Sequence, residues 1–299
     1  MKIAITGGTG FVGSELTKLL QQQGHEIFIL TRKKSYSANG IHYIQWLTKN
    51  AKPEEHLQNI DAFVNLAGTS LNEGRWTAER KKDIYESRMV ATKEVLRIIR
   101  VLDEKPKVLV NASAIGIYPS SKAATYTESS RQVAKDYLGK TVMHWEYEAK
   151  KAEKFGVRVA MARFGVILGK DAGALPLMGL PYKLFVGGTV GSGSQWVSWI
   201  HIKDVASALC FAVENDRFIG PFNVTAPNPV RMKQVGEIIA ATLKRPHWFP
   251  APSILLKLAL GEKSQLVLEG QQVLPKVLLA EKFHFEYSTL NTALENLYA

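Results

Sequence analysis

The stretch MKIAITGGTGFVGSELTKLL, residues 1–20, decides the fold. A short apolar run of strand type precedes the glycines, and the residues after them have the apolar spacing of a helix. Gly7, Gly10 and Gly13 form the pattern G-x-x-G-x-x-G at this junction. Glycines permit a tight turn with positive φ and let a pyrophosphate approach backbone N–H groups at the positive end of a helix. The stretch therefore predicts a dinucleotide cradle, the alternative being an ordinary glycine-rich βα turn.

Working outward from this unit, strands and helices alternate through the first half of the chain. The predicted strands are short and apolar: 2–6, 26–31, 62–67, 107–113 and 157–164. Helical spacing lies between them: 11–23, about 76–103 and about 132–155. Buried apolar strands joined by helices are typical of a parallel sheet covered on both faces. The predicted fold class is α/β, with a Rossmann-type doubly wound parallel sheet.

The regular alternation ends after Phe164, where a stretch rich in Gly and Pro predicts loops and one short helix. A helix and then a strand follow at about 200–226, which we expect to return to the main sheet. We predict a Rossmann lobe of 1–168 plus about 200–226. The remainder, about 169–199 and 227–299, is predicted to form a smaller, mostly helical substrate lobe.

The end of the second strand indicates which dinucleotide is bound. An NAD-binding chain commonly carries Asp or Glu there, but this chain reads Thr31, Arg32, Lys33 and Lys34. A guanidinium can hold a 2′-phosphate through charge-assisted hydrogen bonds, whereas an acid repels it. We therefore expect the cofactor to be NADP(H), the alternative being a solvated Arg32.

Composition excludes several other classes of protein. The 299 residues are 46% hydrophobic and carry a net charge of +11, but the basic residues are dispersed and not interleaved with aromatics. We expect no nucleic-acid partner, no membrane partner, since no long uncharged apolar run occurs, and no metal site, since no ligand spacing occurs. The single cysteine, Cys210, lies in a helical pattern and is predicted to be a core residue, which favours a reducing, cytoplasmic setting.

Several motifs together resemble those of a known family. GGTGFVG (7–13), NLAG (65–68) and NASAIGIYP (111–119) are similar to extended short-chain dehydrogenases/reductases. WEYEAKKAE, RFGVILGKDAGALP, VGSGSQWVSWIH, NVTAPNPV and LEGQQVLPKVL resemble the atypical, NAD-dependent epimerase/dehydratase-like branch called epimerase family proteins. The resemblance covers nearly the whole chain. It implies an NADP-binding Rossmann fold, an unassigned substrate, and a small C-terminal domain of unknown function at about 246–294.

The resemblance also implies cofactor contacts at matching positions. These are Gly7, Thr9, Gly10, Phe11, Val12, Gly13, Thr31, Arg32, Leu66, Ala67, Gly68, Asp83, Arg88 and Ile167. For Asp83 and Arg88, a solvated pair on the helix is an equal alternative.

The catalytic set of the wider superfamily is a Ser or Thr, a Tyr, and a Lys four residues after the Tyr. Ser113 matches the first position, and Tyr137 stands at a suitable separation from it, but its fourth following residue is Thr141. Lys140 is a possible substitute. Tyr147 and Lys151 satisfy the spacing but lie late in the helix, and a degenerate or different site remains open.

Three further residues are candidates on the substrate side: Tyr118, Trp196 and His201, each of which has a structural alternative. The predicted function is an NADP-dependent oxidoreductase or epimerase-like enzyme acting on a hydroxyl or carbonyl carbon, with a nucleotide sugar as the default small-molecule substrate. The alternative is a non-catalytic NADP(H)-binding redox sensor or regulatory protein. A homodimer is possible.

Overall fold

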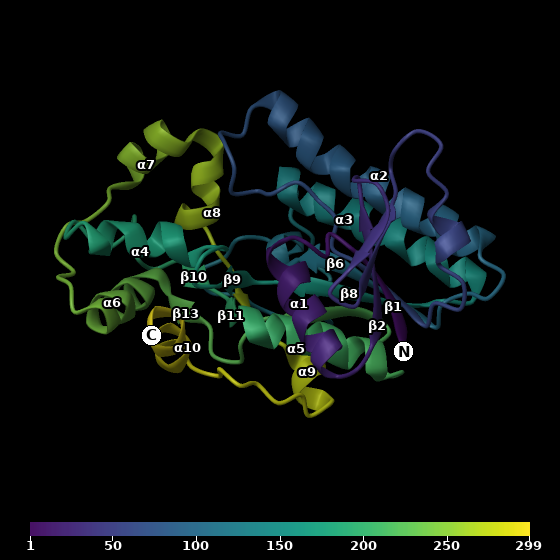
Figure 1. The fold of residues 1–299 in the computed structure, drawn as a ribbon. Helices are drawn as coiled ribbons and strands as arrows, with labels where there is room; N and C mark the ends of the chain where they lie inside the picture. Colours follow the sequence, from purple (N-terminus) through teal and green to yellow (C-terminus); the bar gives the residue numbers. More distant parts are fainter.

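The computed structural model describes all residues, 1–299, and is built on one eight-stranded sheet (Figure 1). The strand order is β12-β8-β6-β5-β1-β2-β4-β3. All pairings are parallel except β3 with β4. The strands are β1 Lys2–Thr6, β2 Glu26–Thr31, β3 Tyr36–Ala38, β4 Ile41–Gln45, β5 Ala62–Asn65, β6 Val108–Ala114, β8 Arg158–Phe164 and β12 Gly220–Val224. The order reverses between β1 and its neighbours β2 and β5, so the prediction of a Rossmann-type doubly wound sheet is confirmed.

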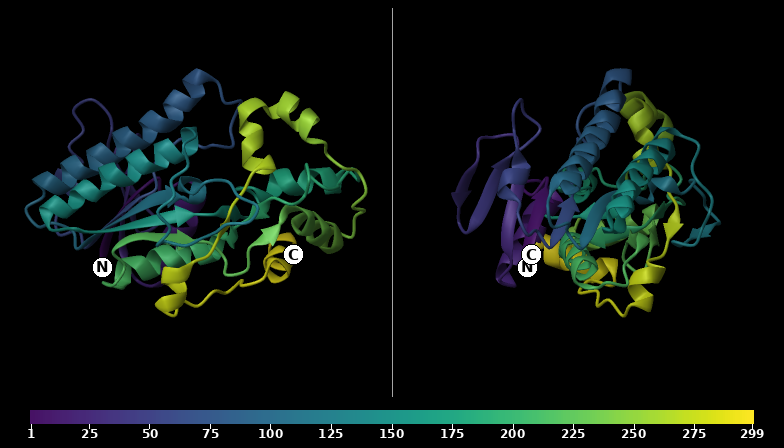
Figure 2. Two further views of the ribbon diagram at one scale, coloured as in Figure 1. Left: turned by 180° about the vertical axis from the view of Figure 1, so that it is seen from behind. Right: turned by 90° about the vertical axis from the view of Figure 1, so that its right-hand side faces the viewer.

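Helices cover both faces of this sheet (Figure 2). α1 (Phe11–Gln22) and α5 (Ile202–Glu214) lie on one face, and α2 (Ala78–Val101) and α3 (Tyr137–Lys150) on the other. The two apolar faces form separate cores, one centred on Leu16, Leu20 and Leu209, the other on Phe63 and Val95. Strands buried on both sides explain why the sequence shows continuous apolar runs rather than alternation.

Capping side chains set the starts of α2 and α3. The Thr77 hydroxyl accepts a hydrogen bond from Arg80 N at 3.1 Å at the start of α2, and the Asp136 carboxylate accepts one from Gly139 N at 2.8 Å at the start of α3. The helix predicted from about 132 therefore begins five residues later, at Tyr137, because Asp136 ends the preceding loop.

The β3–β4 hairpin was not predicted. β4 lies near the edge of the sheet and buries only Ile41 and Ile44 fully, so its sequence, IHYIQ, lacks the continuous apolar run of the central strands. Tyr36 and Tyr43 stack across the hairpin with ring centroids 4.3 Å apart.

A second, mostly helical lobe lies beyond the carboxyl ends of the strands (Figure 1). Its helices are α4 Leu175–Lys183, α6 Met232–Leu243, α7 Ser253–Leu260, α8 Gln265–Leu268 and α10 Leu290–Tyr298. Short strands accompany them: β9 Val166–Leu168, β10 Trp196–Val197, β11 Trp199–His201 and β13 Val230–Arg231. Its core gathers Tyr182, Trp199, Ile239 and Leu294.

One segment differs from the expected lobe boundary. β14 (Gln272–Val273) pairs with β7 (Thr125–Tyr126), and α9 (Lys276–Ala280) packs on β12. Leu278 on α9 belongs to the core of the main sheet. The chain thus returns to the Rossmann lobe before α10, because α9 covers apolar surface at the β12 edge.

Candidate functional site

The glycine pattern forms a tight turn at the carboxyl end of β1. Gly7 has φ +67°, and Gly10 N donates to Gly7 O at 3.0 Å. A Cβ on Gly13 would lie 2.2 Å from Gly7 O, so that position requires glycine. The first turn of α1 has neither a capping side chain nor an acidic residue. Its N–H groups are free for an anion, so the turn fits a pyrophosphate.

Polar side chains at the ends of three strands hold the cradle together. The Thr6 hydroxyl donates to Asn65 Oδ1 at 2.6 Å and accepts from Leu66 N and Ala67 N, both at 3.1 Å. Asn65 Nδ2 donates to Asn111 Oδ1 at 2.6 Å. All three side chains are fully buried. Our sequence reasoning missed this network, although each of these polar residues interrupts or ends an otherwise apolar strand.

Arg32 follows β2, the strand beside β1. Its side chain is exposed and makes neither a hydrogen bond nor an ion pair. Thr31 Oγ1 accepts from Lys33 N at 3.3 Å, which turns the chain at this point. The end of β2, the strand beside the cradle, therefore carries an unpaired guanidinium and no carboxylate.

Arg88 and Asp83 on α2 are not a pair. Arg88 Nη1 donates to Ile84 O at 2.8 Å and to Thr69 O at 3.2 Å, and its guanidinium lies 5.1 Å from the Trp145 ring. Burial lowers the pKa of Arg88 to about 10. Asp83 is exposed without a partner. Arg88 thus supports the loop after β5, including Gly68, where an added Cβ would contact its side chain at 3.4 Å.

Phe11 and Ile167 close the other side of the cradle. The Phe11 ring lies so near the backbone that a Cβ on Gly169 would meet it at 2.5 Å and one on Gly173 at 2.8 Å. Ile167 O accepts from Ala174 N at 3.1 Å within the same loop. The loop after β9 is therefore packed onto the first residue of α1.

Ser113 is part of a buried network rather than a free strand-end hydroxyl. Its Oγ donates to Glu146 Oε1 at 2.6 Å. Arg163 donates from Nε and Nη2 to the two oxygens of Glu146, each at 2.7 Å, and from Nη1 to the Tyr118 hydroxyl at 2.8 Å. The Tyr118 hydroxyl in turn donates to Asn223 Oδ1 at 2.9 Å. Burial raises the pKa of Tyr118, although Arg163 opposes the shift.

Tyr137 is the first residue of α3 and half-buried. Its hydroxyl donates to Lys81 O at 2.6 Å, and its ring meets Trp76 edge-on at 6.0 Å. Burial raises the pKa of Tyr137, and the charges of Arg88 and Lys81 only partly oppose this. Lys140 is exposed and makes no contact with it. The phenol is therefore held as a hydrogen-bond donor.

The pair that satisfies Tyr-x-x-x-Lys literally lies elsewhere. Tyr147 is 69% exposed, and Lys151 forms an ion pair with Glu148 at 2.7 Å. The structure does not bring this pair to the cradle, because the neighbouring Trp145 and Glu146 form the buried face of α3.

The two remaining substrate-side candidates, His201 and Trp196, make structural contacts. His201 is 1% exposed, stacks on Tyr287 with centroids 3.9 Å apart, and accepts from Lys203 N through Nδ1 at 3.1 Å, which caps α5. Burial lowers the pKa of His201 to about 4. Trp196 donates to Lys122 O at 3.1 Å and stacks under the Arg231 guanidinium at 3.6 Å.

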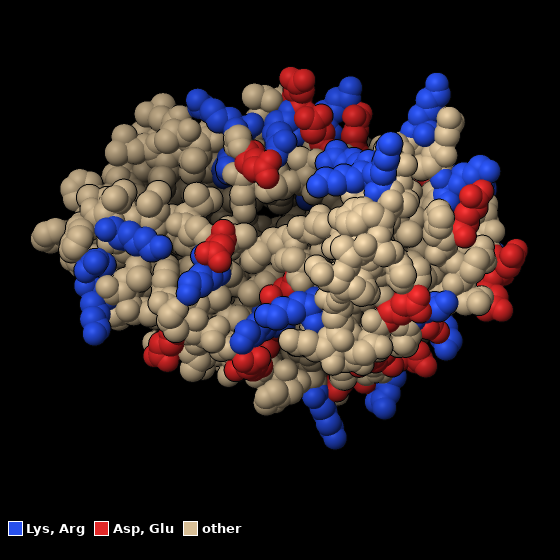
Figure 3. All heavy atoms as spheres, viewed as in Figure 1, with Lys and Arg blue, Asp and Glu red and all other residues tan.

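A hollow opens between the two lobes near the cradle, visible as the dark centre of Figure 3. Two contacts join the start of α2 and the loop before it to α7 and to η4 (Gly261–Ser264). Lys81 pairs with Glu262 at 2.7 Å, and Arg75 donates to Leu258 O at 3.3 Å. The position beyond the strand ends is where ligands of open α/β sheets bind.

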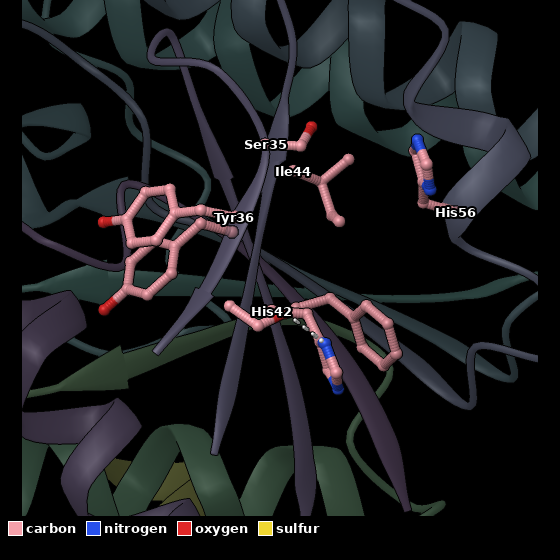
Figure 4. A pocket seen from close by; sticks show the side chains of 8 residues that line it. Ser35, Tyr36, His42, Ile44 and His56 are labelled. Atoms are coloured by element: carbon pink, nitrogen blue, oxygen red, sulfur yellow. Dashed lines mark hydrogen bonds between the residues drawn. The ribbon is translucent and has the colours of Figure 1, made fainter. Parts of the chain in front are cut away.

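Another hollow lies on the β3–β4 hairpin (Figure 4). Its volume is about 300 Å³, and Tyr36, His42, Ile44 and His56 are among its lining residues. Ser37 Oγ and His42 Nδ1 are 3.0 Å apart. None of the predicted site residues lines it.

No group of three or more His, Cys, Asp or Glu side chains is arranged to hold a metal ion. No helix combines the length and apolarity needed to cross a bilayer.

The sheet, the glycine cradle and the hollow beyond it define a Rossmann-type protein whose cradle fits the pyrophosphate of a dinucleotide. The model of the NAD dependent epimerase/dehydratase family matches residues 3–225. The chain belongs to this family, so the resemblance inferred from the sequence is confirmed. A second model, a domain of unknown function (DUF1731), matches residues 251–297.

Similar proteins match this chain over nearly its whole length. The epimerase family protein YfhF of Bacillus subtilis (strain 168) is 50% identical over 300 residues, covering 100% of this chain and 98% of that one. The structure of human epimerase family protein SDR39U1 (isoform 2) with NADPH is 31% identical, with a TM-score of 0.88 and 99% of both chains covered. A nucleoside-diphosphate sugar epimerase from Corynebacterium glutamicum is 30% identical with a TM-score of 0.79; this chain is covered completely, and 58% of that chain.

Proposed function

We propose that this protein is an NADP(H)-dependent short-chain dehydrogenase/reductase with epimerase-like chemistry at a hydroxyl or carbonyl carbon. The observation that carries the cofactor assignment is the unpaired Arg32 guanidinium beside the glycine cradle. The human neighbour solved with NADPH supports the same choice. By analogy with the Corynebacterium neighbour, the substrate class is a nucleotide sugar.

The chain offers a place for each part of the cofactor. The turn of Gly7, Gly10 and Gly13 and the amino end of α1 would hold the pyrophosphate, with Thr9, Phe11 and Val12 alongside. Arg32 and Thr31 would hold the 2′-phosphate through charge-assisted hydrogen bonds. The adenosine half would pass the loop of Leu66, Ala67 and Gly68, which Arg88 supports. Asp83 on the same helix and Ile167 complete the proposed set of cofactor contacts. When bound, the cofactor supplies hydride transfer.

Proton exchange with the substrate is assigned to Tyr137, with Ser113 as a second hydroxyl. Glu146 accepts the Ser113 proton in the present hydrogen bond, so the Ser113 oxygen keeps its acceptor capacity for a substrate hydroxyl. Tyr137 can donate its proton to a substrate only by leaving the Lys81 carbonyl, its hydrogen-bond partner at 2.6 Å.

We assign residues 169–199 and most of 227–299 to the substrate lobe. The single buried thiol, Cys210, fits a reducing cytoplasm, and the substrate is a small molecule.

One observation favours a second candidate, a non-catalytic NADP(H)-binding sensor. Tyr137 has no lysine four residues later, and burial raises its phenol pKa more than the charges of Arg88 and Lys81 lower it. A phenol in this state is a weak base at neutral pH. A carbonyl panel with NADPH, followed at the nicotinamide absorbance, separates the candidates. Turnover that falls about 100-fold or more in Tyr137→Phe, with unchanged NADPH affinity, supports the enzyme; tight NADPH binding without turnover supports the sensor.

The cofactor assignment is tested by calorimetry with NADPH and NADH on Arg32→Ala and on Lys34→Ala. Lys34 is a matched control, since it is also exposed and cationic but lies two residues further along. Arg32→Ala is expected to weaken NADPH binding by about ten- to a hundredfold, the value of one charge-assisted hydrogen bond, and to leave NADH binding within about twofold. Equal losses for both cofactors would contradict the assignment.

A further inference from the structure

An exposed apolar face lies at the far end of the helical lobe. Ten large apolar side chains there are at least half exposed: Leu177, Leu180, Leu184, Phe185 and Val186 on and after α4, and Trp248, Phe249, Ile254, Leu255 and Leu258 before and on α7. We call this set the α4–α7 face. Figure 3 shows this end of the molecule, where α7 lies above α4, as predominantly uncharged.

Two segments more than 60 residues apart in the sequence form one surface. Trp248 Nε1 donates to Phe185 O at 2.9 Å, and Trp248 N and Phe249 N both donate to Gly187 O at 3.0 Å. Ala251 N donates to Thr189 O at 2.9 Å. The exposed rings are thus fixed by the backbone of the neighbouring segment.

No side chain of α7 is buried against the rest of the chain. Its eight residues, SILLKLAL, include none that is buried, although six of them are apolar. Ile254 and Leu258 are each 71% exposed. An apolar face of this extent on a protein surface marks an interaction site.

The charges within these two segments have a single sign. Between residues 172 and 202 the only charged side chain is Lys183, and between 238 and 261 the charged ones are Lys244, Arg245 and Lys257, all exposed. None of the four forms an ion pair; the Arg245 guanidinium only rests on the Phe185 ring at 4.4 Å. Four acids border these segments in the sequence: Glu237 pairs with Lys233, Glu262 pairs with Lys81, Asp204 is buried, and only Asp171 is exposed without an ion pair.

This charge pattern decides between possible occupants. An isologous dimer through the α4–α7 face would bring like charges together, which is unfavourable. An anionic bilayer attracts the four cations and takes up the apolar side chains, and a tryptophan favours its interfacial region. We propose that the α4–α7 face docks the protein on the surface of an anionic phospholipid bilayer, without crossing it. This differs from the absence of a membrane partner expected from the sequence.

The test uses the full-length protein and vesicles of phosphatidylglycerol with phosphatidylcholine, or of phosphatidylcholine alone, in co-sedimentation. We expect binding to the anionic vesicles at least tenfold stronger than to the neutral ones, and weakened by added salt. Leu255→Glu should reduce vesicle binding at least tenfold. Ile219→Glu is the matched control, since Ile219 is 71% exposed but lies outside the face, and it should bind as the unmodified protein does.

Three outcomes would overturn the proposal: no binding to anionic vesicles, equal loss in Leu255→Glu and Ile219→Glu, or a dimer in solution that Leu255→Glu dissociates while vesicles stay unbound. Circular dichroism and NADPH calorimetry check that Leu255→Glu is folded. Because the face lies outside the cradle, NADPH affinity should be unchanged in this variant, so the docking proposal and the cofactor assignment fail independently.

Discussion

Glu146 on α3 and Arg163 on β8 form a buried ion pair in which two guanidinium nitrogens each donate to a different carboxylate oxygen at 2.7 Å. Although burial opposes it, the hydrogen bonds and charge of Glu146 raise the pKa of Arg163 above its ordinary value. Glu146 also accepts a hydrogen bond from the Ser113 hydroxyl, and Arg163 donates one to the Tyr118 hydroxyl. The ion pair therefore connects α3 and β8 to the predicted catalytic serine on β6.

Removing the negative charge of this pair should cost the fold considerable stability. Glu146→Gln leaves the buried Arg163 without a counter-charge, and we expect a loss of about 3–5 kcal/mol in the free energy of unfolding. Urea denaturation measures it. Glu86→Gln is the control, since Glu86 pairs with Lys82 on the exposed side of α2 at 3.9 Å and should cost less than about 0.5 kcal/mol. Similar losses in both variants would show that the buried pair contributes no more to the free energy of unfolding than the exposed pair does.

The cradle should fail when its narrowest position gains a methyl group. In Gly13→Ala the new Cβ would lie 2.2 Å from Gly7 O and 2.6 Å from Gly8 Cα, so the turn must open. NADPH binding, followed by calorimetry, is expected to fall at least about tenfold, as more than one backbone hydrogen bond to the pyrophosphate is lost. In Gly116→Ala the new Cβ meets only Leu138 at an ordinary 3.6 Å, and affinity should be retained. Unchanged binding in Gly13→Ala would place the pyrophosphate elsewhere.

Stability should fall in mild acid because of His201. Burial lowers the pKa of His201 to about 4, from an ordinary value near 6.5. Between these two pH values the unfolded chain binds a proton that the folded chain does not, so stability is complete above about pH 6.5 and decreases as the pH falls towards 4. The largest contribution is about 3 kcal/mol.

This prediction is measured as urea stability from pH 7 to pH 4 in the unmodified protein and in His201→Asn, which keeps an acceptor at the start of α5. The variant should show a flatter dependence over this range. His56→Gln, at an exposed position, should follow the unmodified protein. Parallel curves for all three proteins would be inconsistent with a buried neutral His201.

Cys210 should be inert in the folded protein. The thiol is buried in α5, donates to Gln23 Oε1 at 3.0 Å, and has its pKa raised to about 12 by burial. At pH 8 about one part in ten thousand is thiolate, the reactive form. Iodoacetamide followed by mass spectrometry should therefore find no adduct unless denaturant is present. Rapid modification of the native protein at one equivalent would mean that α5 opens readily.

The sequence predicted the Rossmann lobe closely, and in places to the residue. The strands at 2–6 and 26–31 were identified from apolar runs, and a helix and a strand were expected at about 200–226, where α5 and β12 lie. Such patterns are local, so a central strand or an amphipathic helix carries its own signal. The β3–β4 hairpin was missed because β3, at the edge of the sheet, has no buried residue and β4 beside it has only two, so both carry little of that signal.

The candidate site divides in the same way. The glycines and Arg32 could be identified because a turn and the strand beside it are each encoded in a few consecutive residues. The surroundings of Ser113, Tyr137 and His201 could not, since their partners, Glu146, the Lys81 carbonyl and Tyr287, are brought to them from other elements.

By itself, then, the sequence determined a parallel α/β sheet and a glycine turn between strand and helix, with cations after the next strand, since both depend on short-range order along the chain. Only the tertiary structure decided which polar groups are buried together, and which apolar segments stay uncovered. The α4–α7 face illustrates the reason: each of its two segments alone reads as an ordinary apolar helix or loop. Whether such residues become core or surface depends on what packs against them, which the chain settles only when it folds.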